Sequence, residues 1–303
     1  MDQKVLIVYY SQTGQLKEIV DSFSSPFIEN KMSVEVVKIP LVEEYAFPWT
    51  GKRFFDVMPE SVLGIPSKLG DLKFKESSYD LIVLAYQPWF LSPSIPTTSV
   101  LNHPEFIKIL KGSNVITLIG SRNLWIAAQE KVKALLNTAG ATLVGNIVLV
   151  DKNNYLASAV SILHWLINGK KEKYLGIFPK PGISDEDIRD SSKFGKIISK
   201  CMIENNYSDI QKSLIEKGAV EVKSNLMFIE SRAIIFFSIW AKTILKKKNR
   251  ELWLSLFKYY LMFALFIVSP IVLTLNMILF RPFFLQSNAR KKKYYLGLNE
   301  TIK

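Results

Sequence analysis

Segments dominated by apolar residues, of which the first is uninterrupted, alternate along the chain with stretches in which apolar residues recur every three or four positions. The apolar segments are rich in β-branched and aromatic residues, as is typical of parallel strands buried on both faces. They cover residues 5–10, 34–39, 79–86, 114–120 and 142–150. Apolar residues at helical spacing occupy 16–27, 104–110, 122–138 and 155–168. Strands that alternate with helices in this way predict an α/β fold, a doubly wound five-stranded parallel sheet spanning residues 1–169.

A different pattern begins at residue 170. Lysine-rich turns with glycine and proline separate short amphipathic stretches up to residue 225. Ser184 can cap a helix in which Asp187 stands three positions later, and one or two further helices are predicted for residues 190–217. We therefore expect a helical extension at 170–225.

Residues 226–303 form an apolar and basic tail. An amphipathic helix is predicted for 228–245, and residues 259–280 carry no charge over a length that can cross a bilayer, which takes roughly 20 residues. Basic clusters stand on both sides, at 246–250 and at 290–293. A single crossing would bias Lys and Arg to one side, so we expect a helical hairpin at 252–284 with Pro270 near its apex. A true single span and a soluble core helix are the alternatives.

Composition narrows the chemistry and the location. The single cysteine, Cys201, excludes disulfides within the chain, and the two histidines have no close-spaced ligand residues, so no metal site is expected. Residues 1–169 hold 15 Lys or Arg and 15 Asp or Glu, whereas residues 170–303 hold 24 and 12. A basic tail beside apolar runs favours membrane lipids over nucleic acid. Without a recognisable signal peptide, we expect the protein at the cytoplasmic face of the inner membrane.

The loop after the first strand has the composition of a phosphate-binding loop. It consists of Ser11, Gln12, Thr13, Gly14 and Gln15. A phosphate at this point would meet unpaired backbone N–H groups at the positive end of the helix dipole, and glycine lets the backbone approach closely. The missing lysine excludes a Walker A motif, and the missing glycine series excludes a dinucleotide fingerprint. An ordinary turn with Ser and Thr caps is the alternative.

This S-x-T-G-x loop resembles that of the flavodoxin-like superfamily, in which it holds the phosphate of FMN, and the resemblance implies the strand order 2-1-3-4-5. In that superfamily the loops after the third and fourth strands flank the flavin ring. Here they contain Gln87, Pro88, Trp89 and Phe90, and Ser121, Arg122, Asn123 and Trp125. Trp89 is the first stacking candidate, and Arg122 is a candidate cation beside the N1/C2 edge of the ring. The alternatives are aromatic core residues and an arginine that faces solvent.

Two further features bear on the site. His103 precedes the helix that begins at Pro104 and is a candidate general base, since histidine titrates near neutrality; a solvent-facing residue beside the cap is the alternative. The insertion at 41–78 carries Phe47, Trp49, Phe54 and Phe55 around a short helix predicted at 53–58. It is expected either to wall a pocket or to cover the sheet edge.

Taken together, the segments VLIVYYSQTGQL, YQPWF and GSRNLW and the basic, apolar tail resemble a family of bacterial flavodoxin-like proteins named dialkylresorcinol-condensing enzymes. The resemblance implies FMN as cofactor, a ketosynthase as partner and a lipid-like substrate related to flexirubin-type pigments. Condensation needs a nucleophilic cysteine, and Cys201 has no histidine partner in the sequence. We therefore expect an FMN-dependent oxidoreductase that aromatises a cyclic dione formed by the ketosynthase, with His103 and Arg122 as catalytic residues.

Two other functions compete with this one. A membrane-associated FMN-dependent NAD(P)H:quinone reductase would use the same fold and pocket, and a non-catalytic scaffold for the ketosynthase would use the fold without flavin. Binding to nucleic acid is not expected, and a homodimer is left open.

Overall fold

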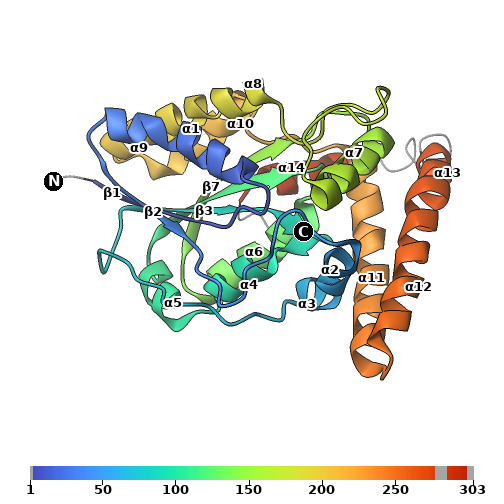
Figure 1. The fold of residues 1–303 in the computed structure, drawn as a ribbon. Coiled ribbons are helices and arrows are strands. Elements are labelled where there is room, and N and C mark those ends of the chain that lie inside the picture. Colours follow the sequence, from blue (N-terminus) through green and yellow to red (C-terminus); the bar gives the residue numbers. More distant parts are fainter. Residues whose placement is uncertain (1–2, 277–284, 299–303) are drawn as a thin grey trace.

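A five-stranded, all-parallel sheet forms the centre of the computed structural model, which describes residues 3–276 and 285–298 (Figure 1). Its strands are β1 (Lys4–Tyr9), β2 (Ser33–Lys38), β3 (Leu81–Tyr86), β6 (Asn114–Ser121) and β7 (Thr142–Val150). They lie in the order β2-β1-β3-β6-β7. This confirms the predicted order 2-1-3-4-5, because the two remaining strands form a small sheet of their own. The sheet is therefore doubly wound and flavodoxin-like.

Burial explains the unbroken apolar runs of the central strands. Every residue of β3 is buried, and β1 is buried from Val5 onward, whereas the edge strand β2 is half-exposed. Helices cover both faces (Figure 1). One face carries α1 (Gln15–Glu29), α8 (Asp185–Asp190), α9 (Ser192–Ile203) and α10 (Ile210–Glu216). The other carries α4 (Ile95–Leu101), α5 (Pro104–Leu110) and α6 (Ile126–Thr138).

The helical extension packs into the same core as the sheet. Ser184 caps α8 by accepting from the Asp187 N–H at 3.0 Å, as predicted. Helices α9 and α10, joined by the short helix η1 (Tyr207–Asp209), account for the predicted helical stretch at 190–217. Helix α9 lies so close to α1 that a Cβ at Gly195 would stand 2.1 Å from the carbonyl oxygen of Phe23. Only glycine fits there.

The segment between β3 and α5 departs from the expected loop. It folds into a hairpin of β4 (Pro88–Trp89) and β5 (Ser92–Pro93), followed by α4. The two residues at the hairpin turn, Phe90 and Leu91, have φ of 48° and 62°, as a type I′ turn requires, although such turns usually take Asn and Gly. Lys131 of α6 holds the hairpin in place, because its Nζ donates to Ser92 Oγ at 2.8 Å and to the Val62 carbonyl at 2.7 Å.

The aromatic insertion forms two short helices, α2 (Gly51–Asp56) and α3 (Met58–Leu63), where one was predicted. Helix α6 begins at Ile126, four residues later than the apolar pattern indicated. Helix α7 (Tyr155–Asn168) has its predicted bounds and is capped by Asn154. It lies beyond the carboxyl ends of the strands (Figure 1).

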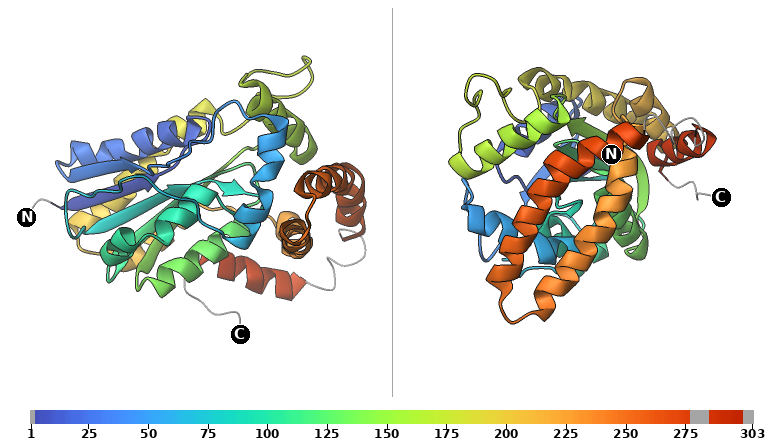
Figure 2. Two further views of the ribbon diagram at one scale, coloured as in Figure 1. Left: turned by 60° about the horizontal axis from the view of Figure 1, so that its bottom comes forward. Right: turned by 90° about the vertical axis from the view of Figure 1, so that its right-hand side faces the viewer.

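The tail forms a pair of antiparallel helices across the same end of the sheet (Figures 1 and 2). Helix α11 (Ser224–Lys246) turns at residues 247–249 into α12 (Arg250–Phe263), which continues through a π-helical segment, η2 (Ala264–Val268), into α13 (Ser269–Leu275). Among the described residues, this continuous helix is the one that is long and apolar enough to cross a membrane. Its most apolar window has a mean hydropathy of 2.0 and is 11% buried.

The predicted reversal at Pro270 is wrong. Pro270 is the second residue of α13, and the helix continues through it. Proline lacks an N–H and its ring crowds the preceding turn; the π-helical segment η2 before it accommodates the ring and the missing hydrogen bond. The chain reverses at residues 247–249 instead. The rest of the predicted hairpin, residues 277–284 with Arg281, lies outside the described residues.

Helix α14 (Leu285–Leu296) carries the basic cluster 290–293 and packs against α6, where the Tyr294 hydroxyl donates to the Glu130 carboxylate at 2.5 Å.

Arg250 fixes the helix pair to the insertion. Its Nη1 and Nη2 donate to the two carboxylate oxygens of Glu60 at 2.7 and 2.8 Å, its Nε donates to Asp56 Oδ1 at 3.0 Å, and Nη2 also donates to the Asp56 carbonyl at 2.6 Å. A bidentate arginine of this kind is directional as well as strong. The start of α12 is therefore held against α2 and α3.

Replacing Arg250 with Gln should destabilise the protein by about 1–3 kcal/mol, because it leaves the partly buried carboxylate of Glu60 without its cation and Asp56 with Arg53 alone. Urea denaturation in a mild detergent measures the loss. Lys52→Gln is the matched control, since it breaks the neighbouring pair with Glu251, whose side chains are 76% and 74% exposed, and should change stability by less than about 0.5 kcal/mol. Equal losses in the two variants would contradict the anchoring role of Arg250.

Candidate functional site

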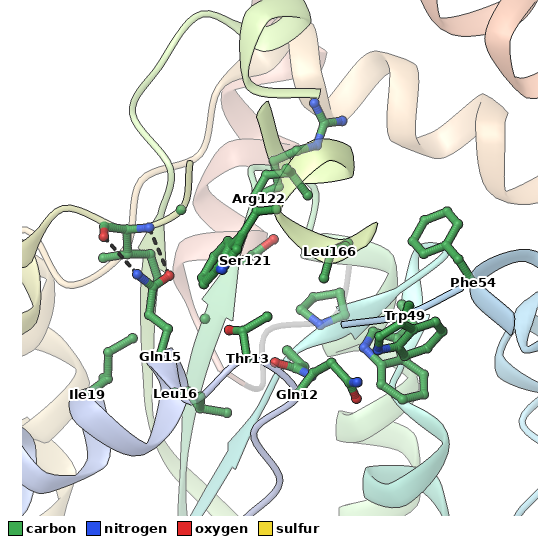
Figure 3. A pocket seen from close by; sticks show the side chains of 18 of the residues that line it. Gln12, Thr13, Gln15, Leu16, Ile19, Trp49, Phe54, Ser121, Arg122 and Leu166 are labelled. Carbon is green, nitrogen blue, oxygen red and sulfur yellow. Dashed lines mark hydrogen bonds between the residues drawn. The ribbon is translucent and has the colours of Figure 1, made fainter. Parts of the chain in front are cut away.

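A cleft opens at the carboxyl ends of β1, β3 and β6, where the chain leaves the sheet toward opposite faces (Figure 3). It encloses about 1020 Å³ of empty space, its open mouth included. Doubly wound sheets bind ligands at this position. The lining residues come from the three predicted loops, the start of α1, the end of β6, the insertion, α7 and the loop before α8. They are Gln12, Thr13, Gln15, Leu16, Ile19, Trp49, Phe54, Gln87, Pro88, Trp89, Phe90, Gly120, Ser121, Arg122, Ile162, Trp165, Leu166, Gly182 and Ile183.

The first loop leads into a helix that lacks a side-chain cap. Gly14 is the N-cap of α1, has φ of 86° and contributes no side chain. The Lys17 N–H donates to the Gly14 carbonyl at 3.0 Å, so among the described residues the amides of Gln15 and Leu16 are the ones at the start of α1 that have no partner. Thr13 points into the cleft beside them (Figure 3). Ser11 is not among the lining residues, and its Oγ accepts from the Lys17 N–H at 3.4 Å. The Thr13 hydroxyl and the amides of Gln15 and Leu16 therefore remain at the start of α1, beside the cleft.

The two glutamines of this loop are engaged within the protein. Gln12 is buried; its Nε2 donates to the carbonyl of Tyr45 at 3.1 Å, and its Oε1 accepts from the Tyr10 hydroxyl at 2.7 Å. The Gln15 side chain forms two hydrogen bonds of 3.0 Å with the backbone of Ile183 (Figure 3). The expectation that the Gln15 side chain offers donors to a phosphate is therefore corrected: it fastens α1 to the loop before α8.

Aromatic side chains form one wall of the cleft. Trp49 and Phe54 of the insertion pack edge-on with ring centroids 5.9 Å apart, and Trp49 meets Trp89 at 5.0 Å. The opposite wall is α7, with Ile162, Trp165 and Leu166. The backbone N–H of Trp49 donates to the Leu166 carbonyl at 2.7 Å, which ties the two walls together. The insertion thus walls the pocket, which was one of its two predicted roles.

Two side-chain nitrogens of the lining residues are buried without a hydrogen-bond partner among the described residues. They are Nε1 of Trp49 and Nε2 of Gln87. A buried donor without a partner costs about 1–3 kcal/mol. Both belong to the walls of the cleft, so a ligand with carbonyl or ring-nitrogen acceptors matches the unused hydrogen-bonding capacity of this site.

The segment after β6 contributes fewer residues to the lining of the cleft than predicted. Ser121 and Arg122 line the cleft, but Asn123 and Trp125 line a separate hollow, and Trp125 is 3% exposed in the core. The Arg122 guanidinium points away from Thr13 (Figure 3), donates from Nη1 to the Tyr155 carbonyl at 2.8 Å and lies over the Tyr155 ring. It stands at the mouth of the cleft.

Sequence reasoning missed Glu230, a buried carboxyl of α11 that caps α6. Its Oε1 accepts from the Ala127 N–H at 2.8 Å. Burial raises the pKa of Glu230 from its ordinary value near 4.5 to about 7, although hydrogen bonds from the amides of residues 125–127 oppose that shift. The start of α6 is therefore occupied by the protein's own carboxyl, whereas the start of α1 has no such side-chain cap. One signal was present in the sequence: Glu230 is the only acidic residue of α11.

His103 lies away from the cleft, which contradicts its expected pocket-side position. It is the N-cap of α5, after α4 has carried the chain toward the end of the sheet where the chain begins (Figure 1), and it is not among the lining residues. Arg122 is the only ionisable side chain among the described residues that line the cleft. Neither His103 nor His164 is among the residues that line the cleft.

The other candidate groups lie elsewhere. His164 stacks on Tyr174 with ring centroids 4.0 Å apart, in keeping with its expected structural role. Cys201 is buried in α9, and burial raises the pKa of its thiol, which makes it a poor nucleophile. Among residues 3–276 and 285–298, no group of three His, Cys, Asp or Glu side chains could hold a metal ion.

Solved structures of flavoproteins are weakly similar to this chain. A flavoprotein from Lactobacillus acidophilus in complex with FMN is 18% identical over 48% of this chain and 93% of that chain, with a TM-score of 0.39. A flavoprotein from Bacteroides eggerthii is 17% identical over 55% and 99% of the two chains, with a TM-score of 0.39. A flavone reductase is 13% identical over 68% and 65%, with a TM-score of 0.36.

No protein-family model and no curated protein matches the chain. At these identities and TM-scores, the fold assignment rests on the strand order of the sheet itself.

The contribution of Glu230 to the free energy of unfolding should fall by about 3 kcal/mol between pH 4.5 and 7. Over this range the Glu230 carboxyl is already ionised in the unfolded chain but still protonated in the folded one, so rising pH favours unfolding by about 1.36 kcal/mol per unit. Glu230→Gln should remove this slope, as measured by urea denaturation at several pH values. Glu221→Gln, an exposed change in the segment before α11, should keep it. An unchanged slope in Glu230→Gln would exclude Glu230 as its source.

Proposed function

We propose that the protein binds FMN in the cleft and catalyses a flavin-dependent oxidation–reduction. The proposal rests on one observation: the cleft lies at the β1/β3 switch point, between the uncapped start of α1 and an aromatic wall. In the flavodoxin-like strand order, FMN binds at this switch point. The fold alone does not establish a function, so the argument depends on the residues.

The phosphate of FMN fits the first turn of α1. Thr13 would donate its hydroxyl, Gly14 allows the backbone to approach, and the free amides of α1 supply the remaining donors. The start of α6 cannot compete for the phosphate, because Glu230 occupies it.

The flavin ring fits between the aromatic wall and α7. Trp49, Phe54 and Trp89 would exclude water on one side, and Trp165 on the other. Gln87, with its unpartnered nitrogen, would orient the ring by donating to one of its acceptors. When bound, FMN supplies an acceptor for a hydride equivalent.

The finer proposal is aromatisation of an alkylated cyclic 1,3-dione to a dialkylresorcinol. The dione loses two hydrogen atoms, one as a hydride to FMN and one as a proton to solvent, and an oxidant such as a quinone or dioxygen then recovers the electrons. The cleft offers no protein base, and a 1,3-dione needs none because it ionises in neutral water. A ketosynthase would supply the dione, and the cytoplasmic face of the inner membrane is the proposed location, since α12 and α13 expose apolar side chains.

Purification of the full chain in a mild detergent tests the proposal. The protein should be yellow, or become so with added FMN, and should bleach near 450 nm when it oxidises a 5-alkylcyclohexane-1,3-dione without oxygen. A colourless protein that ignores added FMN would overturn the flavin proposal and leave the scaffold function. FMN binding without oxidation of the dione would overturn only the finer proposal.

Replacing Gly14 with Val should lower the affinity for FMN roughly tenfold or more, because it strains the loop and brings a branched side chain to the phosphate. FMN titration measures the change. Gly112→Val is the matched control: its φ of 76° resembles the 86° of Gly14, and a Cβ would meet open space at both positions. Both variants should lose about 1–3 kcal/mol of stability through backbone strain. If Gly112→Val loses as much FMN affinity as Gly14→Val, the phosphate does not sit at this loop.

A further inference from the structure

A second cavity adjoins the cleft and extends from it to the helix pair of the tail. The two share six residues: Phe54, Pro88, Phe90, Ser121, Arg122 and Ile162. The second cavity encloses about 1090 Å³ of empty space, its open side included. Beyond the shared residues, its walls come from α7 and from the facing sides of α11, α12 and η2.

The walls of this cavity are largely apolar. Leu163 of α7, Ala233 and Phe237 of α11, and Leu261 and Leu265 of the following helix lie around it. Its ionisable groups among the described residues are Arg122 at the junction and the two tyrosine hydroxyls of Tyr155 and Tyr260. Ser121 and Ser269 add two hydroxyls, and the remaining lining is apolar. An alkyl chain therefore fits most of this surface without leaving hydrogen bonds of its own unmade.

Phe90 stands where the two cavities meet. Its backbone has the left-handed conformation, with φ of 48°, which strains a residue that has a side chain. In return its ring packs between Phe54 of the insertion, at 5.2 Å, and Phe237 and Phe257 of the helix pair, at 6.4 and 6.2 Å. The strained turn therefore places one aromatic ring at the boundary between the cofactor cleft and the tail.

The helix that forms the outer wall is apolar on its exposed side as well. Phe263, Ile267, Val268 and Ile271 are each between 39% and 58% exposed. An exposed apolar surface of this kind suits contact with a lipid layer. The cavity thus lies between such a surface and the cleft.

We propose that this second cavity binds the alkyl chain of a lipid-soluble substrate while the polar ring of the same molecule reaches the cleft. The inference rests on the proposed function, and it names the substrate class: an oxidisable ring that carries a long alkyl chain. Arg122 at the junction would face the oxygen-bearing end of the molecule, and Phe90 would separate the chain from the flavin ring. Each methylene buried in the cavity should strengthen binding roughly fourfold.

Binding of dansylamino-alkanoic acids to the full chain tests this without any turnover. The probes carry 6, 8 and 11 carbon atoms, and dansyl fluorescence reports their binding at concentrations below micelle formation. In the wild type the Kd should fall steeply from the shortest to the longest probe. Ala233→Phe fills the cavity from α11 and should weaken the binding of the longest probe at least tenfold, while Leu265→Trp does the same from the opposite wall.

Ser231→Phe is the matched control, because it adds the same ring to the same helix at an exposed position outside the cavity; it should bind the probes as the wild type does. Equal affinity for all chain lengths, or equal binding by Ala233→Phe and Ser231→Phe, would overturn the inference.

FMN titration of the same variants separates the two proposals. Unchanged FMN affinity shows that the filled variants are folded, and chain-length-dependent probe binding by a protein that ignores FMN would leave the cavity assigned and the flavin function rejected.

Discussion

Parallel pairing of β1 with β3 is the constraint on which the site depends. Because β2 lies on the other side of β1, the connection after β1 runs over one face of the sheet and the connection after β3 over the other. The chain parts at the carboxyl ends of these two strands, and the crevice between them cannot be filled by either connection. Thr13 enters it from the first connection and Gln87 from the second. The insertion and α7 then only have to close its sides.

The apolar tail differs in composition from the rest of the chain but is not separate from it in packing. Near its beginning, Glu230 supplies the cap of α6, and just after its turn Arg250 binds the carboxylates of the insertion. Both elements carry or adjoin residues that line the cleft. Helix α6 follows the loop that contains Arg122, and the insertion contains Trp49. Cutting the chain at residue 223 would therefore uncap α6 and release the insertion, so the composition boundary near residue 225 is not a boundary of stability.

The sheet was predictable because its signal is local and repeated. Each strand lies in a short segment of the sequence that is dominated by apolar residues. The place of the first loop, between β1 and α1, was predictable for the same reason, since its five residues are contiguous. The engagement of the Gln12 and Gln15 side chains with Tyr45 and Ile183 was not. What failed depended on distant contacts. Trp165 reads as one more apolar residue of an amphipathic helix, and only the fold brings it opposite Trp49. His103 was misplaced because the residues before it, rich in Ser, Thr and Pro, read as a loop although they form a hairpin and a helix. Pro270 was taken as a chain reversal, although proline is tolerated in the first turn of a helical segment.

The contact between α1 and α9 has a consequence for how relatives of this protein can be identified. At the point where Gly195 meets the carbonyl of Phe23, no side chain of any size can be accommodated without moving one helix away from the other. Chains whose sequences have otherwise diverged beyond recognition, but which keep this extension on this sheet, should retain a glycine in the helix that crosses the first one. A single glycine, placed after the last strand and inside the first helix of a short helical pair, would then mark the architecture where overall sequence similarity no longer does.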